Sequence, residues 1–107
     1  MAFTGLEDHS ITLAEAAALT ANYRASVPTG STLGHYFGGD AISAILAQEG
    51  CVGVRIYYGL KDDGTEQLII VGVDAYENDM TSGLLAEKSI LCPNQCGSAN
   101  VLNSSSS

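Results

Sequence analysis

The sequence predicts a single small α+β domain, in which two helices pack on a small, mainly antiparallel sheet built around a central β-hairpin. Two segments have the apolar spacing and the capping signals of helices. Between residues 51 and 74 the spacing changes to the alternation typical of strands, interrupted by a hairpin turn. With 107 residues, the chain can bury a core without metal or disulfide staples and is too short for two ordinary domains.

The first helix is expected from Leu13 to about Ser26. Thr12 and Glu15 have the spacing of a capping box, in which the two side chains satisfy free backbone N–H groups. Pro28 follows the helix and prevents its continuation. The buried stripe of this alanine-rich helix is expected to comprise Leu13, Ala16, Ala17 and either Thr20 or Tyr23.

A loop is expected from Pro28 to Asp40, because four glycines and one proline fall among these thirteen residues. Asp40 is expected to cap a second helix, from Ala41 to about Gln48. Gly50 stands where a left-handed residue would end that helix.

The hairpin begins with the strand Cys51–Leu60, and Asp63-Gly64 supplies the turn signal. The returning strand, Gln67–Asp74, is apolar on both faces and should therefore be central or covered on both sides. One face of the first strand carries apolar side chains at alternate positions: Val52, Val54, Ile56, Tyr58 and Leu60.

A third strand is favoured for Leu84–Leu91, with one short helix as the alternative, because apolar residues alternate loosely and Pro93 follows. Residues 1–103 are accordingly predicted to form the globular domain. Residues 104–107 are four serines and have no power to form a core, so they are predicted to be a tail.

The charge balance limits the partners. Twelve acidic residues against four basic ones give a net charge of −8, which argues against nucleic acid or an anionic membrane as the principal partner. The N-terminus lacks the basic and apolar regions of a secretion signal, so a cytoplasmic location is expected. Most acidic residues fall in predicted turns and near the N-terminus, where they form a solvated rim.

Arg55 is the one charged residue inside the first strand, and Tyr57 lies on the same face. An arginine among apolar neighbours needs a partner. The structural interpretation is an ion pair with Asp74 or Glu66. The functional interpretation is a site that holds a carboxylate or phosphate group between the guanidinium and tyrosine hydroxyls.

Three bulky residues in the glycine-rich loop, His35, Tyr36 and Phe37, are the other candidate binding residues. The paired glycines before the second helix suit an anion, but no strand or lysine completes a phosphate-binding pattern and Asp40 would repel a phosphate. The favoured interpretation is an aromatic plug over the core, and ligand contact is the alternative.

Two further clusters contain metal-ligating residue types. Asp74, Glu77 and Asp79 could offer oxygen ligands to Ca²⁺, but their spacing does not match an EF-hand, so a solvated turn is favoured. Cys92 and Cys96 are expected to be structural thiols at a turn, with a disulfide or a metal site as alternatives.

Cys51 is expected to be a small buried hydrophobic residue, the third structural thiol.

No cofactor is expected, and no motif of nucleophilic catalysis is present in the sequence. The sequence therefore favours a small, acidic, self-associating structural or protein-interaction domain without catalysis, whose partner is itself or another protein. The alternative is a ligand-binding or enzymatic domain, with a pocket around Arg55, Tyr57 and the 35–37 loop.

Overall fold

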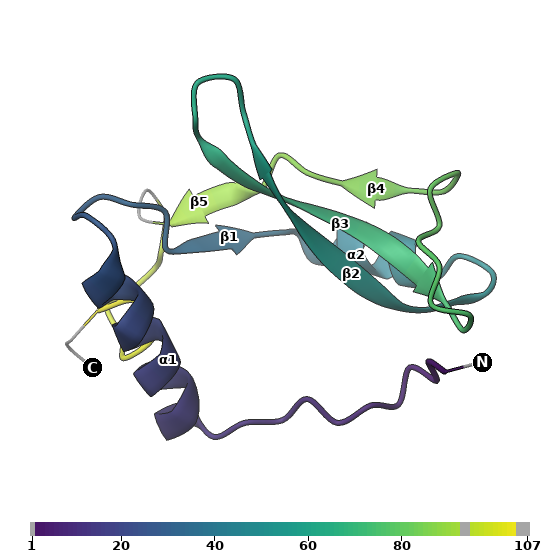
Figure 1. Cartoon of the computed structure of the whole chain (residues 1–107), viewed down its shortest axis with the longest axis horizontal. Helices are drawn as coiled ribbons and strands as arrows, with labels where there is room; N and C mark the ends of the chain where they lie inside the picture. Colours follow the sequence, from purple (N-terminus) through teal and green to yellow (C-terminus); the bar gives the residue numbers. More distant parts are fainter. Residues whose placement is uncertain (1, 93–94, 105–107) are drawn as a thin grey trace. The chain divides into compact units, whose positions relative to one another are not determined.

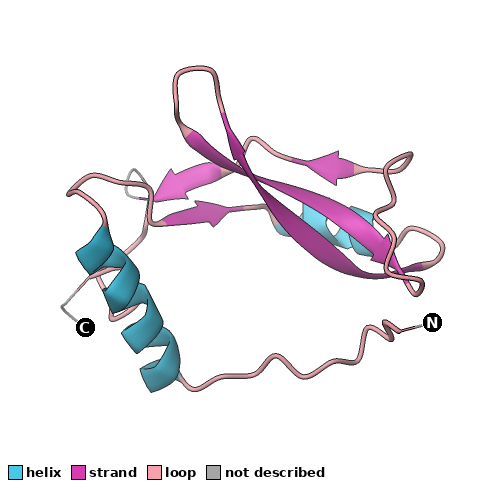
Figure 2. Cartoon of the chain, viewed as in Figure 1, coloured by secondary structure: helices cyan, strands magenta, loops and turns pink. Residues whose placement is uncertain are grey.

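The structure is a computed structural model that describes residues 2–92 and 95–104. It has two helices and two small antiparallel sheets, which confirms the α+β class (Figures 1 and 2). The element order is α1 (Leu13–Ser26), β1 (Gly34–Tyr36), α2 (Gly39–Leu46), β2 (Cys51–Leu60), β3 (Glu66–Asp74), β4 (Leu85–Ala86) and β5 (Ile90–Cys92).

The chain divides into two units. The hairpin unit contains the N-terminal residues up to Asp8 and the range Tyr36–Ser89, and its sheet has the strand order β2-β3-β4. The disulfide unit contains His9–His35 and the chain from Ile90 onward, with α1, β5 and the first two residues of β1, which pairs with β5. Pro93, the predicted strand stop, and the tail residues 105–107 lie outside the described residues.

The hairpin unit is built on the antiparallel pair β2 and β3, as predicted, with Leu60 opposite Glu66 and Arg55 opposite Val71. At the turn, Gly64 takes a φ of +88°, which glycine adopts without a steric penalty. The Asp63 carboxylate accepts the backbone N–H of Thr65 at 2.9 Å and fixes the turn.

β3 is the central strand, as its continuous apolar run predicts. Ile70, Val71 and Val73 are all at most 3% exposed, although neighbouring residues of a strand point to opposite faces. Gln67 is also buried, and its side-chain oxygen accepts a hydrogen bond from the Ser89 hydroxyl at 3.2 Å. The core of this unit therefore lies on both faces of β3.

α2 covers one face of the hairpin (Figure 1). Its Ile45 is 1% exposed, and a Cβ added to Gly72 of β3 would lie 3.4 Å from the Ile45 Cγ2 atom. The glycine therefore lets the helix approach the strand closely. Gln48 joins this packing, because its Oε1 atom accepts the Leu84 N–H at 2.8 Å.

The prediction that Asp40 caps this helix is wrong. α2 begins at Gly39 with Gly38 as its N-cap, and no side chain supplies a cap hydrogen bond. Asp40 lies instead in the first turn, where a carboxylate still interacts favourably with the helix dipole. Gly50 follows the helix with a φ of +84°, as expected.

The predicted third strand is present in two pieces. β4 pairs with β3, with Ala86 opposite Ile70, whereas β5 pairs with β1 in the other sheet. Between them Lys88 takes a φ of +60°, an uncommon conformation for a residue with a side chain. This change of backbone direction ends one strand before the next begins. The alternative, a short helix, does not form.

In the disulfide unit, α1 has the predicted bounds and the predicted capping box. The Thr12 hydroxyl accepts the Glu15 N–H at 3.1 Å, and the Glu15 carboxylate accepts the Thr12 N–H at 3.0 Å. The expected stripe is only partly correct. Ala16, Ala17 and Thr20 are half-buried, whereas the side chains of Leu13 and Tyr23 are exposed.

The loop predicted over residues 28–40 contains the short strand β1, which sequence reasoning missed. Leu33 N donates to Cys92 O at 2.7 Å, next to the β1-β5 pairing. A three-residue strand that begins with glycine has too few alternating positions to be recognised from its pattern.

Among the described residues, neither helix has the length and the apolar composition that a membrane span needs.

Candidate functional site

Arg55 and Tyr57 lie on the same face of β2 and share one acidic partner, Asp79. The Arg55 guanidinium donates to one carboxylate oxygen of Asp79 and forms an ion pair with it. The Tyr57 hydroxyl donates to the other carboxylate oxygen. We call these three residues the Asp79 cluster.

Two further contacts surround Arg55. Its Nη1 atom lies 3.4 Å from the backbone oxygen of Glu77, and its Cζ atom lies 6.0 Å from the centre of the Phe3 ring. The latter distance is at the limit for a cation–π contact. The ion-pair interpretation is therefore supported, but the partner is Asp79 rather than Asp74 or Glu66.

The turn that follows β3 explains why Asp79 is the partner. The Asp74 carboxylate accepts the backbone N–H groups of Tyr76 and Asn78 at 2.9 and 3.0 Å, so it stabilises its own turn. The chain then reverses, and Asp79 forms a bridge with Val73, two residues from the position opposite Arg55. Because this reversal depends on the turn, the strand pattern could not identify Asp79.

The acidic bend does not assemble a metal site. The carboxylates of Asp74 and Asp79 are occupied by backbone and side-chain donors of this chain. Within the part of the chain that the structure describes, no three His, Cys, Asp or Glu residues are grouped so as to hold a metal ion. The bend is a hydrogen-bonded turn.

The hydrogen bonds of the cluster stabilise the ionised form of the Asp79 carboxyl and the protonated form of the Tyr57 hydroxyl. Hydrogen bonds from the Tyr57 hydroxyl and then the Arg55 guanidinium lower the pKa of the Asp79 carboxyl below its ordinary value. The same carboxylate raises the pKa of Tyr57, because the hydrogen bond stabilises the protonated phenol. At neutral pH, Arg55 is consequently balanced by a carboxylate of its own chain.

The other predicted binding residues lie where the chain passes between the two units. His35 is the last residue of the first segment of the disulfide unit, and Tyr36 begins the second segment of the hairpin unit. His35 and Phe37 are half-buried, and Tyr36 is exposed. A pocket that combines these residues with Arg55 and Tyr57 stays a prediction.

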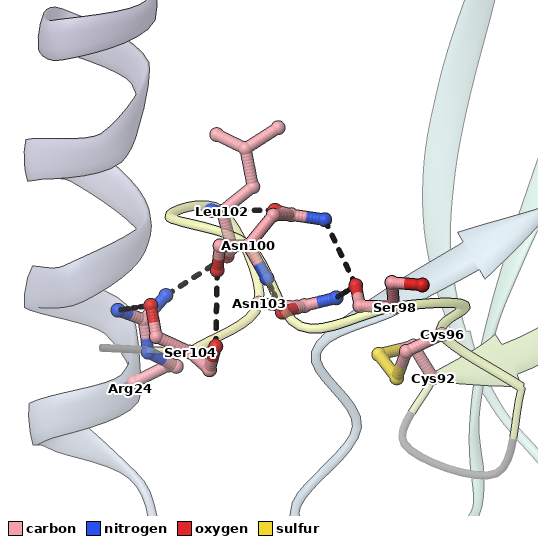
Figure 3. The surroundings of a disulfide bond; sticks show 8 residues. All are labelled: Arg24, Cys92, Cys96, Ser98, Asn100, Leu102, Asn103 and Ser104. Atoms are coloured by element: carbon pink, nitrogen blue, oxygen red, sulfur yellow. Dashed lines mark hydrogen bonds between the residues drawn. A yellow bond between two sulfur atoms is a disulfide. The ribbon is translucent and has the colours of Figure 1, made fainter. Parts of the chain in front are cut away.

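The cysteines differ from one another. Cys51 is a free, half-buried thiol whose Sγ atom lies 3.2 Å from the Gly53 backbone oxygen. Cys92 and Cys96 form a disulfide, so their assignment as free structural thiols or as metal ligands is corrected (Figure 3). Their Cα atoms are 4.7 Å apart, within the range that a disulfide spans. Sulfur atoms joined in a disulfide are not thiolates, which are the form of cysteine that binds a metal.

The segment after the disulfide is attached to α1 by Arg24. The Arg24 guanidinium donates to the backbone oxygens of Leu102 and Ser104, at 2.8 and 3.2 Å (Figure 3). Asn100 supports the turn, because its side-chain oxygen accepts the Leu102 N–H at 2.8 Å. Ser104, the first residue of the predicted tail, is therefore hydrogen-bonded to α1.

The outer edge of β2 is the second candidate site. In the described part of the chain β2 is the outer strand of its sheet. It is ten residues long, and its only charged residue is Arg55. The side chain of Tyr58 is 95% exposed and that of Leu60 is 73% exposed, and the turn end of the hairpin extends beyond α2 (Figure 1).

The hydrogen bonds indicate which residues of β2 face this edge. Just beyond the strand, Lys61 N donates to Thr65 O at 2.9 Å, so the backbone of Lys61 faces the returning chain. Successive residues of a strand face opposite sides. Residues 55, 57 and 59 therefore bond towards β3, and residues 54, 56, 58 and 60 present their N–H and C=O groups to the free edge.

A bond on the far side of β3 agrees with this assignment. Met80 N donates to Gly72 O at 2.8 Å, and Gly72 is opposite Val54. The carbonyl of Gly72 therefore points away from β2, as required if Val54 faces the free edge. We call residues 54–60 the β2 edge.

The N-terminal segment limits the β2 edge at one end. A Cβ added to Gly5 would lie 2.5 Å from the Val52 backbone oxygen, so the two backbones are in close contact there. The edge residues after Val52 carry exposed apolar side chains on the face that α2 partly covers: Val54, Ile56, Tyr58 and Leu60.

Comparison of the chain with known protein families, with curated proteins and with solved structures finds no match. Function is therefore inferred from the geometry of the Asp79 cluster and of the β2 edge.

Proposed function

We propose that this protein is a self-associating structural domain, and that the β2 edge is the surface through which copies of the chain meet. The observation that carries the proposal is a long strand that is outermost among the described residues, with exposed apolar side chains and with backbone groups that face away from β3. Another extended strand is the partner that satisfies both features, because it supplies backbone hydrogen bonds and apolar contacts together.

The charge distribution favours a second copy as that partner. The chain carries a net charge of −8, so two copies repel one another over most of their surfaces. β2 contains no acidic residue. Its edge is therefore a place where two copies can approach without placing carboxylates opposite one another.

The Asp79 cluster has a structural role in this proposal. Arg55 and Tyr57 both bind Asp79, which lies on the far side of β3. The cluster therefore ties the middle of β2 to the turn that follows β3. A strand held in this way is better prepared to pair with another chain, because less conformational entropy is lost on association.

The proposal is tested by size-exclusion chromatography with light scattering at about 0.5 M salt, where charge repulsion is screened over a few ångströms. The wild-type chain is expected to form dimers or larger particles as concentration rises. Tyr58→Lys, which places a charge on the β2 edge, is expected to weaken this association. Tyr76→Lys is the matched control, because Tyr76 is also exposed but lies in the turn after β3.

A wild-type chain that stays monomeric at high concentration and high salt would contradict self-association. Equal weakening by both variants would indicate a general effect of added charge and would remove the β2 edge from the proposal. Circular dichroism of each variant serves as a control that the change leaves the fold intact.

A further inference from the structure

We infer a specific pairing for this interface: two β2 edges pair antiparallel about a two-fold axis, with Tyr57 of one copy opposite the partner's Tyr57. The inference rests on the proposed function and specifies the geometry of the same surface. Three observations lead to it: the position of charges along the hairpin, the alternation of edge-facing residues, and the contact of Gly5 with Val52.

Charge decides the direction of pairing. A parallel arrangement would place the acidic turns of the two copies, Asp62 and Asp63, side by side. Like charges in adjacent positions repel one another. The antiparallel arrangement places the two turns at opposite ends of the ladder, so their carboxylates are as far apart as the strands allow.

The backbone restricts the register. An edge-facing residue exchanges both of its hydrogen bonds only with an edge-facing residue of the partner. In β2 these residues are 54, 56, 58 and 60, so each must lie opposite another even-numbered residue. The two-fold axis must then pass through a single residue position. The candidates near the middle of the edge are 55, 56, 57 and 58.

Charge removes two of these four registers. An axis at position 55 places Arg55 opposite the partner's Arg55. An axis at position 58 places Arg55 opposite the partner's Lys61. Each puts like charges directly across the ladder, which is destabilising.

The contact of Gly5 with Val52 decides between the two remaining registers, which have the axis at position 56 or at position 57. An axis at position 56 pairs Leu60 with the partner's Val52, whose backbone oxygen is already in close contact with Gly5. With the axis at position 57, the hydrogen bonds between the two copies are made by residues 54, 56, 58 and 60 and by no other residue of β2. It pairs Val54 with the partner's Leu60 and Ile56 with the partner's Tyr58.

This register also suits the side chains. Arg55 lies opposite the partner's Gly59, so no charged or bulky group opposes it and its bond with Asp79 can persist. The axis is perpendicular to the sheet, so α2 of each copy lies on the same face of the joined sheet. On that face, the apolar side chains of the two β2 edges lie next to one another in one strip. This contact removes part of their apolar surface from water.

Cysteine scanning tests the register directly. In a Cys51→Ser background, Tyr57→Cys places the new thiols opposite one another in a non-hydrogen-bonded pair, with Cα atoms about 4.5 Å apart. A disulfide spans that distance. Tyr57→Cys is therefore expected to give the fastest intermolecular disulfide under mild oxidation, measured by mass spectrometry of the cross-linked peptides.

Ile56→Cys and Tyr58→Cys are the matched controls. In the inferred register each new cysteine is diagonal to its counterpart, at about 7–8 Å, which is beyond the reach of a disulfide. Both are therefore expected to cross-link several-fold more slowly than Tyr57→Cys. Light scattering of the reduced variants reports in parallel whether each still associates.

The outcomes separate the inference from the proposed function. Fastest cross-linking through position 56 or 58 would overturn the register and leave the β2 edge as the interface. Association without cross-links at any of the three positions would overturn the pairing of β2 edges, while self-association would stand. Reduced variants and a wild-type chain that are all monomeric would overturn both.

Discussion

Asp79 connects the two strand residues that the sequence singles out. Arg55 and Tyr57 each bond to a different oxygen of its carboxylate. The need of a strand arginine for an acidic partner was predictable from its apolar neighbours. The identity of that partner was not, because the turn after β3 brings Asp79 back beside Val73 and engages Asp74 in its own hydrogen bonds.

Acid is expected to remove the contribution of Asp79 to stability. The folded-state pKa of Asp79 lies below the ordinary value of 3.8, chiefly because of the Tyr57 hydrogen bond and then that of Arg55. The contribution is therefore fully present above the unfolded-state pKa and is lost as the pH falls through the folded-state pKa. Urea unfolding of wild type and Asp79→Asn should differ at neutral pH, and the difference should vanish in strong acid.

Glu77→Gln is the control for this titration, because Glu77 lies in the same turn but meets Arg55 through its backbone oxygen. Its unfolding curve should follow that of wild type more closely at neutral pH. A stability difference between wild type and Asp79→Asn that is constant from neutral to strongly acidic pH would contradict the assigned hydrogen bonds.

Gly72 is the residue on which the approach of α2 depends. An added Cβ would lie 2.9 Å from Gln48 Nε2 and 3.0 Å from Cys51 Sγ, tighter than ordinary packing. Gly72→Ala is therefore expected to destabilise the fold by about 1–3 kcal/mol, the usual effect of overpacking a core. Denaturant unfolding measures the change.

Gly53→Ala is the matched control on the neighbouring strand, because a Cβ at Gly53 would meet no atom within 4 Å. Its effect should be smaller than that of Gly72→Ala. An equal loss for the two variants would contradict this explanation, because it would mean that the contact of Gly72 with α2 is not what limits stability.

At the scale of elements, regular segments were predictable and short ones were not. α1 and the β2-β3 hairpin follow from capping residues, apolar spacing and the Asp63-Gly64 turn. The sequence pattern does not reveal β1, and after Leu84 it predicts one strand where the structure has two. Strands of two or three residues have no internal pattern to detect, because their existence depends on the strand opposite.

The disulfide fixes the chain just after β5. Its removal by Cys92→Ser with Cys96→Ser is expected to cost about 2 kcal/mol, by the loop-closure entropy of a ring of roughly five residues. Guanidinium unfolding of the disulfide-bonded wild type and of the double variant measures this difference. Adding a reductant should shift the wild type towards the variant and leave the variant unchanged. A reductant effect on both proteins would contradict the assignment.

The oxidation state of this pair depends on the compartment. Disulfides persist in oxidising compartments and are reduced by thiol systems in the cytosol. The expected cytoplasmic location and the Cys92–Cys96 disulfide therefore lead to different states of the same protein. Alkylation of the protein directly in cell extracts, followed by mass spectrometry, distinguishes the two states.

For the whole molecule, the net charge of −8 sets how association responds to salt. At 0.01 M ionic strength charges interact over about 30 Å, whereas at 1 M they interact over about 3 Å. Repulsion between copies is therefore screened as salt rises, and the particle mass measured by light scattering is expected to increase. Association that weakens steadily with salt would indicate attraction between charges and would contradict an interface built on the nearly neutral β2 edge.

The sequence by itself determined the α+β class, the bounds of α1, the hairpin and its turn, and the central place of β3. These features depend on local capping, periodicity and the burial of a continuous apolar run. Only the tertiary structure decided that Asp79 is the partner of Arg55, that Cys92 and Cys96 are joined, and that the apolar face of β2 stays partly exposed. The partner of Arg55 and the exposure of β2 depend on which distant segments the turns bring together, and short-range patterns do not encode this. The two cysteines are only four residues apart, and their bond depends on the conformation of the chain between them, which their spacing alone does not specify.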